Sequence, residues 1–356
     1  MSAALLLTLA AVSAAALSYL AARFLARRGW LPDRPVARSS HKAPTPRTGG
    51  VAVMIGFLGP ALALSALDPD LLRFAALVFA AFMLGFADDA RSLPAVVKLL
   101  GQTALAALFV FLFGAVEALP APFIGAVALG PAAAPLTVFW IVAFMNAYNF
   151  MDGANGLAAT AAIFGLSALA VAIAASGAGA AAAAAALLAA AIFGFLPLNF
   201  PKGRLFLGDS GSQSIGFALA ALAVFAAQAQ AGAASALFAP TAFMPFLFDV
   251  AFTLAHRAAR RRNLLDGHNE HLYQLLIRLG ARHSSVTALY LALVAVSTLA
   301  AIFAGALPAS LQVLAPAGLT ALFLAPALLL YRRAEAAGLL SAPAPAAAVP
   351  LAKAAE

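Results

Sequence analysis

Uninterrupted apolar runs recur along the whole chain, and they constrain its fold more than any other feature of the sequence. Each run is close to the roughly 20 residues that a helix needs to cross a bilayer. The composition agrees, because only 10% of the 356 residues are charged, whereas a soluble globular protein carries about 25%. A transmembrane β-barrel would show short alternating segments instead. The sequence therefore predicts an all-α, multi-pass membrane protein.

The positions of the basic residues predict how the chain crosses the membrane. The first apolar run has no basic residue before it and Arg23, Arg27 and Arg28 just after it, which is the reverse of a cleavable signal peptide. With the N-terminus outside and eleven crossings, every one of the 21 Lys and Arg residues except Arg73 falls on the inside, as expected for cytoplasmic loops. The predicted spans are 3–22, 49–67, 72–87, 95–113, 132–148, 156–175, 180–198, 211–230, 236–256, 286–305 and 308–331.

These loops also account for the formal net charge of +8, so that charge does not indicate nucleic-acid binding. The absence of cysteine excludes disulfides and thiolate metal sites. We expect a single integral-membrane domain over 1–335. The low-complexity segment 336–356 is expected to be a disordered tail on the cytoplasmic side.

Five acidic residues lie at or within the predicted spans. Inserting an ionised carboxylate into the membrane there costs a free energy on the order of 2.5–3.5 kcal/mol. The topology places all of them toward the cytoplasmic face. Carboxylates gathered in this way repel one another unless a cation lies among them. Mg²⁺ suits such a site, because it binds a few carboxylates together with water and substrate phosphate; Mn²⁺ is the alternative. The acids concerned are Asp88, Asp89, Asp152, Asp209 and Asp249.

Each acid also has a purely structural interpretation. Asp88 and Asp89 in "FADDARSL" could end a helix, and Asp152 in "MDGANG" could form a turn. Asp209 in "FLGDSGS" could cap the helix that follows it. Asp249 could be a single buried acid that bonds to a neighbouring helix.

Basic and glycine-rich segments accompany the acids and point to phosphate. "RSSHKAPTPRTGG" contains Lys42 and Arg47 and ends in two glycines, and "FPKGRLFLGDSGS" places Lys202 and Arg204 shortly before Asp209. Point charges, free backbone N–H groups and a metal ion together recognise phosphate. In the last inside loop, His268 and His271 are three residues apart, so a helix there would turn them to the same side.

Four motifs, in this order, resemble the polyprenyl-phosphate N-acetylhexosamine-1-phosphate transferases: "FADDARSL", "NAYNFMDGANGLA", "FLGDSGS" and "DGHNEHLYQLL". The resemblance covers about residues 30–285. That family includes the enzymes that initiate O-antigen synthesis and the phospho-N-acetylmuramoyl-pentapeptide transferases. "RSSHKAPTPRTGG" and "HNEHLYQ" are more similar to the O-antigen branch. The resemblance implies transfer of a sugar 1-phosphate from a UDP-N-acetylhexosamine to undecaprenyl phosphate, with release of UMP.

The resemblance also implies roles for individual residues. Catalysis falls to Asp88, Asp89 and Asp209, and the metal ion to Asp209, Asp89 and Asp152. The substrate-binding residues are expected to be Lys42, Arg47, Asn149, Asp152, Asn155, Lys202, Arg204, His268 and His271. Many relatives carry an aspartate where this chain has Asn155, which leaves uracil recognition open.

Other membrane functions remain as alternatives. A transporter or lipid flippase also uses intramembrane acids, but usually near the midplane and often with inverted repeats. A prenyltransferase or CDP-alcohol phosphotransferase would need further aspartates beside "DDARS". We expect a bacterial inner-membrane enzyme with a cytoplasmic active site and direct attack by the lipid phosphate. The identity of the sugar, the glycan pathway, the lipid length and the existence of a homodimer stay open.

Overall fold

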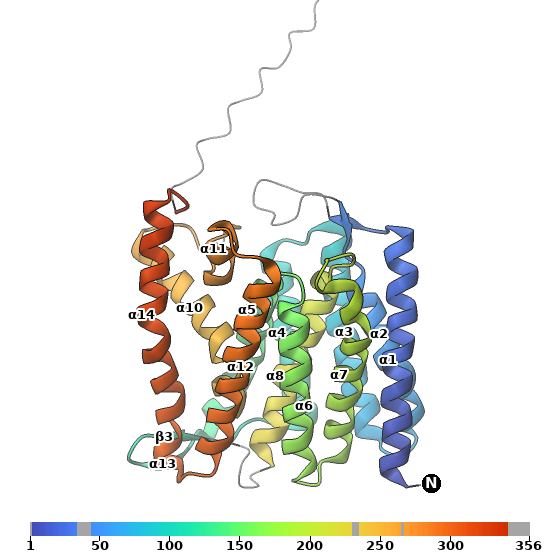
Figure 1. The fold of residues 1–356 in the computed structure, drawn as a ribbon. Helices are drawn as coiled ribbons and strands as arrows, with labels where there is room; N and C mark the ends of the chain where they lie inside the picture. Colours follow the sequence, from blue (N-terminus) through green and yellow to red (C-terminus); the bar gives the residue numbers. More distant parts are fainter. Residues whose placement is uncertain (1, 34–43, 230–234, 265–266, 341–356) are drawn as a thin grey trace, which may run out of the picture.

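The helices run side by side as one bundle (Figure 1) in a computed structural model that describes residues 2–33, 44–229, 235–264 and 267–340. Within these ranges, nine helices are long and apolar enough to cross a membrane. They are α1 (Ala3–Arg28), α3 (Pro69–Arg91), α4 (Ala95–Phe113), α5 (Ala133–Phe150), α6 (Leu157–Ala174), α7 (Gly179–Asn199), α8 (Gly208–Gln228), α12 (His283–Gly305) and α14 (Leu314–Ala336). The predicted all-α polytopic fold is confirmed.

The predicted count of eleven spans is not confirmed in this part of the chain. The expected span at 49–67 is α2 (Gly49–Ser65), an apolar helix of only 17 residues. The expected span at 236–256 is broken into α9 (Phe238–Ala242) and α10 (Met244–Ala259). The break at Phe243 precedes Pro245, which has no N–H to continue a helix and therefore lies in the first turn of α10.

Several helices begin and end where the local sequence favours it. At the start of α3, the Asp68 carboxylate accepts the N–H of Asp70 at 3.0 Å, and Pro69 occupies the first turn. At the end of α1, Gly29 adopts a left-handed conformation with φ 66°, and its N–H bonds to the carbonyl of Leu25.

Short elements lie at the two ends of the bundle. A two-residue pair joins β1 (Pro32–Asp33) to β2 (Thr45–Pro46). A hairpin of β3 (Ala118–Ala121) and β4 (Gly125–Ala128) precedes the 3₁₀ turn η1 (Gly130–Ala132). Figure 1 shows α11 (Leu272–Arg278) near the end where α1 finishes, and β3 and α13 (Ala309–Gln312) near the opposite end.

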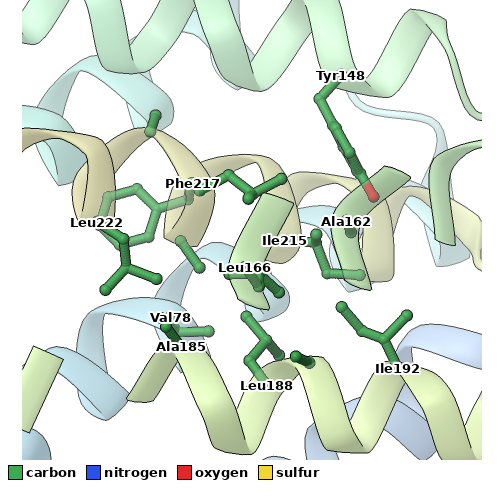
Figure 2. Close-up of a cluster of buried hydrophobic side chains, with 14 of the residues drawn as sticks. Val78, Tyr148, Ala162, Leu166, Ala185, Leu188, Ile192, Ile215, Phe217 and Leu222 are labelled. Carbon is green, nitrogen blue, oxygen red and sulfur yellow. The ribbon is translucent and has the colours of Figure 1, made fainter. Parts of the chain in front are cut away.

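Helix α8 lies at the centre and is almost completely buried. It packs against α2, α3, α5, α6 and α7. Figure 2 shows part of this core, in which Phe217 and Ile215 of α8 lie near Leu166 of α6 and Leu188 of α7. Small residues along α7 and α8 allow the helix backbones to approach closely. The first turn of α8, which carries Asp209, is therefore held by its neighbours.

Candidate active site

A cavity of about 400 Å³ lies at the end of the bundle where α3 and α5 end and α8 begins. Loops that follow α5, α7 and α10 supply more of its lining, and Asp33 of β1, Arg47 and residues of α11 complete it. Residues from all four sequence motifs and from the segment before α2 therefore meet in one place. The predicted site residues that line it are Arg47, Asp89, Asn149, Asp152, Asn155, Asp209 and His268.

Asp89 holds the start of α8. Its Oδ1 accepts the N–H of Asp209 at 3.0 Å, and its Oδ2 accepts the N–H of Ser210 at 2.9 Å. The first N–H groups of a helix have no partner within the helix, so these bonds satisfy two of them. The cap that the sequence suggested for Asp209 thus comes from Asp89 of α3, and the Asp209 carboxylate lines the cavity.

Gly208 makes this approach possible. Its φ of 75° is in the left-handed region, and a Cβ there would lie 2.8 Å from Asp89 Oδ2 and against the carbonyl oxygen of Arg47. A side chain at position 208 would displace Asp89 from the helix start. The glycine of the "LGDSG" stretch therefore has a steric reason to be there.

Arg47 also lines the cavity and contacts Asp89. Its Nη2 donates to the carbonyl oxygen of Asp89 at 2.8 Å, and its Nε lies 3.7 Å from Asp89 Oδ1. Nε is buried and has no hydrogen-bond partner within the described residues. A guanidinium that lines a cavity with an unused donor suits an anionic ligand such as phosphate.

Asp88 is not itself among the lining residues, but its carboxyl group lies within reach of the Asp209 carboxyl group, and it has further partners. Its Oδ1 accepts the N–H of Leu93 at 2.7 Å where α3 ends, and its Oδ2 accepts from Lys98 Nζ at 2.8 Å. Lys98 lies in the first turn of α4, and the sequence analysis did not select it as a site residue. The ion pair places a lysine beside the acidic cluster, which the spacing of ten residues did not reveal.

Asp152 lies in the turn between α5 and α6 and faces the cavity together with Asp209. Burial raises the pKa of Asp152 well above its usual range, and the charges of Asp209 and Asp89 raise it further. Nearby, the Oδ1 of Asn149 accepts a hydrogen bond from Ser212 Oγ at 2.6 Å, which ties the end of α5 to α8. Gathering these acids in one place thus disfavours the ionised form of Asp152 unless a cation is bound among them.

This donor set fits a cation that substrate phosphate would help to hold. Among the described residues, no Lys, Arg or His forms an ion pair with Asp152 or Asp209, and no group of three or more potential ligands is arranged as a closed metal site. Mg²⁺ commonly binds through one or two carboxylates plus phosphate and water. Two carboxylates that line one cavity match that requirement, whereas a structural Zn²⁺ site would need more ligands.

His268 and His271 come together, but not through a helical turn. Helix α11 begins only at Leu272, with His271 as its N-cap, and the two imidazole rings lie 4.9 Å apart. His268 lines the cavity, whereas His271 is buried behind it. Burial lowers the pKa of His268 to about 4, and the charges of His271 and Arg257 act in the same direction. His268 is therefore neutral at pH 7.

The remaining predicted residues lie elsewhere. Lys202 and Arg204 are exposed in the loop between α7 and α8 and do not line the cavity. Lys42 lies outside the described residues. Asn155 lines the cavity, and its Nδ2 donates to the carbonyl oxygen of Pro201 at 3.1 Å.

The lining also contains polar residues that sequence reasoning did not select. Arg278 Nη1 donates to the backbone oxygen and to the Oδ1 of Asn269, both at 3.0 Å, which fixes Asn269 at the cavity edge. For these residues the sequence offered one signal: Asn269 lies between His268 and His271 in "HNEH". The lining residues in this group are Asp33, Asn199, Asn269, Gln274 and Arg278.

Comparison with known proteins finds a family model and relatives that match this chain. Residues 71–227 match the model of glycosyl transferase family 4. A probable undecaprenyl-phosphate N-acetylglucosaminyl 1-phosphate transferase of Bacillus subtilis is 31% identical over 264 residues, which is 73% of each chain. A decaprenyl-phosphate N-acetylglucosaminephosphotransferase of Mycobacterium tuberculosis is 33% identical over 79% of this chain and 78% of its own. A phospho-N-acetylmuramoyl-pentapeptide-transferase of Synechococcus is 36% identical over 54% of this chain and 59% of its own.

Proposed function

The chain belongs to glycosyl transferase family 4, and we propose that it transfers N-acetylglucosamine 1-phosphate from UDP-N-acetylglucosamine to undecaprenyl phosphate. An oxygen of the lipid phosphate forms a bond to the β-phosphorus of the donor. The bond from that phosphorus to the bridging oxygen breaks, and UMP leaves with the bridging oxygen. The products are undecaprenyl-diphosphate-N-acetylglucosamine and UMP.

One observation carries this proposal: the carboxylates of Asp152 and Asp209 and the guanidinium of Arg47 line a single cavity at the end of a membrane bundle. A water-soluble nucleotide sugar can enter from solvent, while a lipid phosphate stays in the bilayer. The names of two of the relatives, which specify a polyprenyl phosphate and N-acetylglucosamine with its phosphate, support the choice of substrates.

Within this proposal, the polar groups divide between the two substrates. Arg47 donates to the diphosphate, and the neutral imidazole of His268 hydrogen-bonds the sugar phosphate. Asn149, Asp152 and Asn155 border the nucleotide. Asp88 is the paired aspartate that activates the lipid phosphate, and the ammonium of its partner Lys98, 2.8 Å away, offsets the repulsion between the two anions. The proposed substrate-binding set also retains Lys42, Lys202, Arg204 and His271.

Asp152 and Asp209 are the residues that would hold Mg²⁺, or Mn²⁺ in its place. When bound, the ion would neutralise negative charge on the diphosphate as the bridging bond breaks. Asp89 contributes by fixing the helix start that carries Asp209, through its bond to the Asp209 N–H at 3.0 Å. We propose direct attack by the lipid phosphate, because the acids serve it without an aspartyl-phosphate step.

The site is proposed to open to the cytoplasm of a bacterial cell, with the chain in the inner membrane. Support comes from the Lys and Arg distribution, since Arg73 alone falls on the opposite side in the predicted topology. The lipid-linked sugar would then begin a cell-surface glycan such as O-antigen.

The test uses purified protein in detergent with undecaprenyl phosphate and a panel of UDP-N-acetyl sugars. We expect lipid-linked product from UDP-N-acetylglucosamine. Product from another sugar of the panel alone would correct the donor and retain the reaction. No product from any sugar, with protein shown to be folded, would contradict the proposal.

A further inference from the structure

Asp249 is a fully buried carboxylate outside the cavity, and it holds the start of α11. It lies in α10 and is 0% exposed. Its Oδ1 accepts the N–H of Leu272 at 2.8 Å, and its Oδ2 accepts the N–H of Tyr273 at 3.2 Å. These are the first two residues of α11. One carboxylate thus satisfies two N–H groups that the short helix cannot satisfy itself.

The same carboxylate has further partners on two neighbouring elements. His271 Nδ1 lies 3.2 Å from Oδ1, and the hydroxyl of Tyr290 in α12 donates to Oδ2 at 2.6 Å. An ionised carboxylate accepts several hydrogen bonds and donates none, so it suits this ring of donors. Asp249 therefore joins α10, α11 and α12 at one buried point.

Helix α11 in turn contacts the turn that carries Asp152. The hydroxyl of Tyr273 donates to the carbonyl oxygen of Phe150 at 3.0 Å. A Cβ on Gly153 would overlap that hydroxyl, so Tyr273 sits directly on the turn. A shift of α11 would therefore move the backbone on both sides of Asp152.

The second contact runs to the histidine on the cavity wall. The ring of His271 lies 4.9 Å from the ring of His268 and stacks on Phe150 at 5.6 Å. His268 lines the cavity, and it is only four residues before Leu272, where α11 begins. The position of His268 thus depends on where α11 begins.

We propose that Asp249 is a positioning residue for the transfer reaction: it sets α11 so that His268 and Asp152 face the cavity together. Asp249 touches neither substrate and acts through His271 and Tyr273. The inference rests on the proposed function for its effect on catalysis, but its structural half can be measured without any substrate.

The experiment replaces Asp249 by Asn in the full chain. An amide nitrogen at Oδ2 would face the N–H of Tyr273, so at least one bond of the cap is lost. We expect faster amide hydrogen exchange in two segments, 150–156 and 268–278, with α8 unchanged. If the Asp249→Asn variant is active, its KM for UDP-N-acetylglucosamine should rise about tenfold or more, because a small displacement of the binding groups weakens substrate binding. The KM for undecaprenyl phosphate should stay within about twofold.

If Asp249→Asn does not fold, a second variant tests the same inference. Tyr273→Phe removes the hydroxyl that contacts Phe150 and leaves both backbone bonds to Asp249. It should speed exchange at 150–156 and leave 268–278 near the wild-type rate. The matched control is Thr298→Val in α12, because that buried hydroxyl bonds to the carbonyl of Val294 in its own helix at 2.8 Å. The control should change neither exchange nor KM.

The outcomes separate this inference from the proposed function. Absence of transfer by the wild type would overturn the function, while the exchange pattern would still decide whether Asp249 sets both segments. Unchanged exchange at 150–156 in both variants would overturn the inference. A variant with less folded protein but normal KM per folded molecule would also overturn it, since that is the result of a purely structural role.

Discussion

The carboxylate of Asp89 caps the helix that carries Asp209, although 120 residues separate them in the sequence. Its Oδ1 accepts the N–H of Asp209 at 3.0 Å. Because that helix start borders the cavity, the cap determines where the Asp209 carboxylate is presented. Both acids line the cavity, but Asp89 also caps the helix start that presents the Asp209 carboxylate.

The first prediction concerns this cap. Asp89→Asn replaces one acceptor oxygen by a donor, so either Asp209 or Ser210 loses a bond. We expect the transfer rate to fall by about 10²-fold or more and the stability by about 0.5–2 kcal/mol. Steady-state transfer and thermal unfolding measure the two effects. Ser214→Ala is the control, because that hydroxyl bonds back to Ser210 and Gly211 within α8; equal losses in both variants would contradict the prediction.

The second prediction separates function from stability at Asp152. Asp152→Asn removes a charge proposed to bind the metal and nucleotide, and we expect transfer to fall by at least about 10²-fold. The folded pKa of Asp152 is raised, so its ionised form opposes folding at neutral pH. The metal-free variant should therefore melt at the same temperature as the wild type or higher near pH 7.5.

That difference has a defined pH dependence. The cost of ionising Asp152 is fully present above its raised folded pKa and disappears as the pH falls toward the unfolded value of 3.8. The melting temperatures of wild type and Asp152→Asn should converge as the pH is lowered in EDTA. Full transfer activity in the variant, or a variant that is less stable at pH 7.5, would count against the assignment.

The third prediction tests close packing at Gly208. Gly208→Ala puts a Cβ within 2.8 Å of Asp89 Oδ2 at a φ of 75°. Backbone strain of this kind costs about 1–3 kcal/mol, and the clash should add to it and abolish transfer. Gly338→Ala is a matched control, since Gly338 has a φ of 71° and a Cβ there would meet nothing within 4 Å. Equal stability losses in the two variants, with transfer retained, would rule out a role for the contact.

The fourth prediction concerns the protonation of His268. Because burial lowers its pKa to about 4, its imidazole should stay neutral from pH 8 down to about pH 5 in the substrate-free protein. Histidine-labelled NMR spectra over this range measure it, with His268→Gln to assign the resonance. A transition near the ordinary value of 6.5 would contradict the buried setting.

The fifth prediction is a metal effect that does not require turnover. If Asp152 and Asp209 hold Mg²⁺, the ion should raise the melting temperature of the EDTA-treated wild type in a concentration-dependent way. Asp209→Asn should show little or no rise. The same rise in both proteins would assign the ion to another place. EDTA should also abolish transfer by the wild type; the Asp209→Asn variant is expected to be inactive with or without it.

The sequence predicted the bundle well, because the length of an apolar run decides whether a helix can cross the bilayer. The count of eleven spans is not confirmed at two places where length alone is a poor guide. The run at 236–256 is long enough, but Pro245 cannot donate within a helix, and the chain breaks at Phe243. The 17 residues of α2 are also fewer than the expected span.

Motif reasoning selected seven of the residues that line the cavity, yet it could not assign their partners. The bond from Asp89 to Asp209 and the bonds from Asp249 to α11 connect elements distant in the sequence, and spacing along a chain carries no information on such contacts. Lys98 was missed for the same reason, since its bond to Asp88 crosses the turn between α3 and α4. Lys202 shows the reverse case: it is close to Asp209 in sequence but exposed outside the lining.

The most direct test of the account follows the β-phosphate of the donor. UDP-N-acetylglucosamine labelled at that phosphorus is incubated with undecaprenyl phosphate and the purified protein, and the lipid and nucleotide products are separated. We predict that the label moves into the lipid fraction in equal amount to the UMP released, and that Asp209→Asn abolishes both. Release of labelled UDP, with sugar but no label in the lipid, would mean ordinary glycosyl transfer and would contradict the central claim.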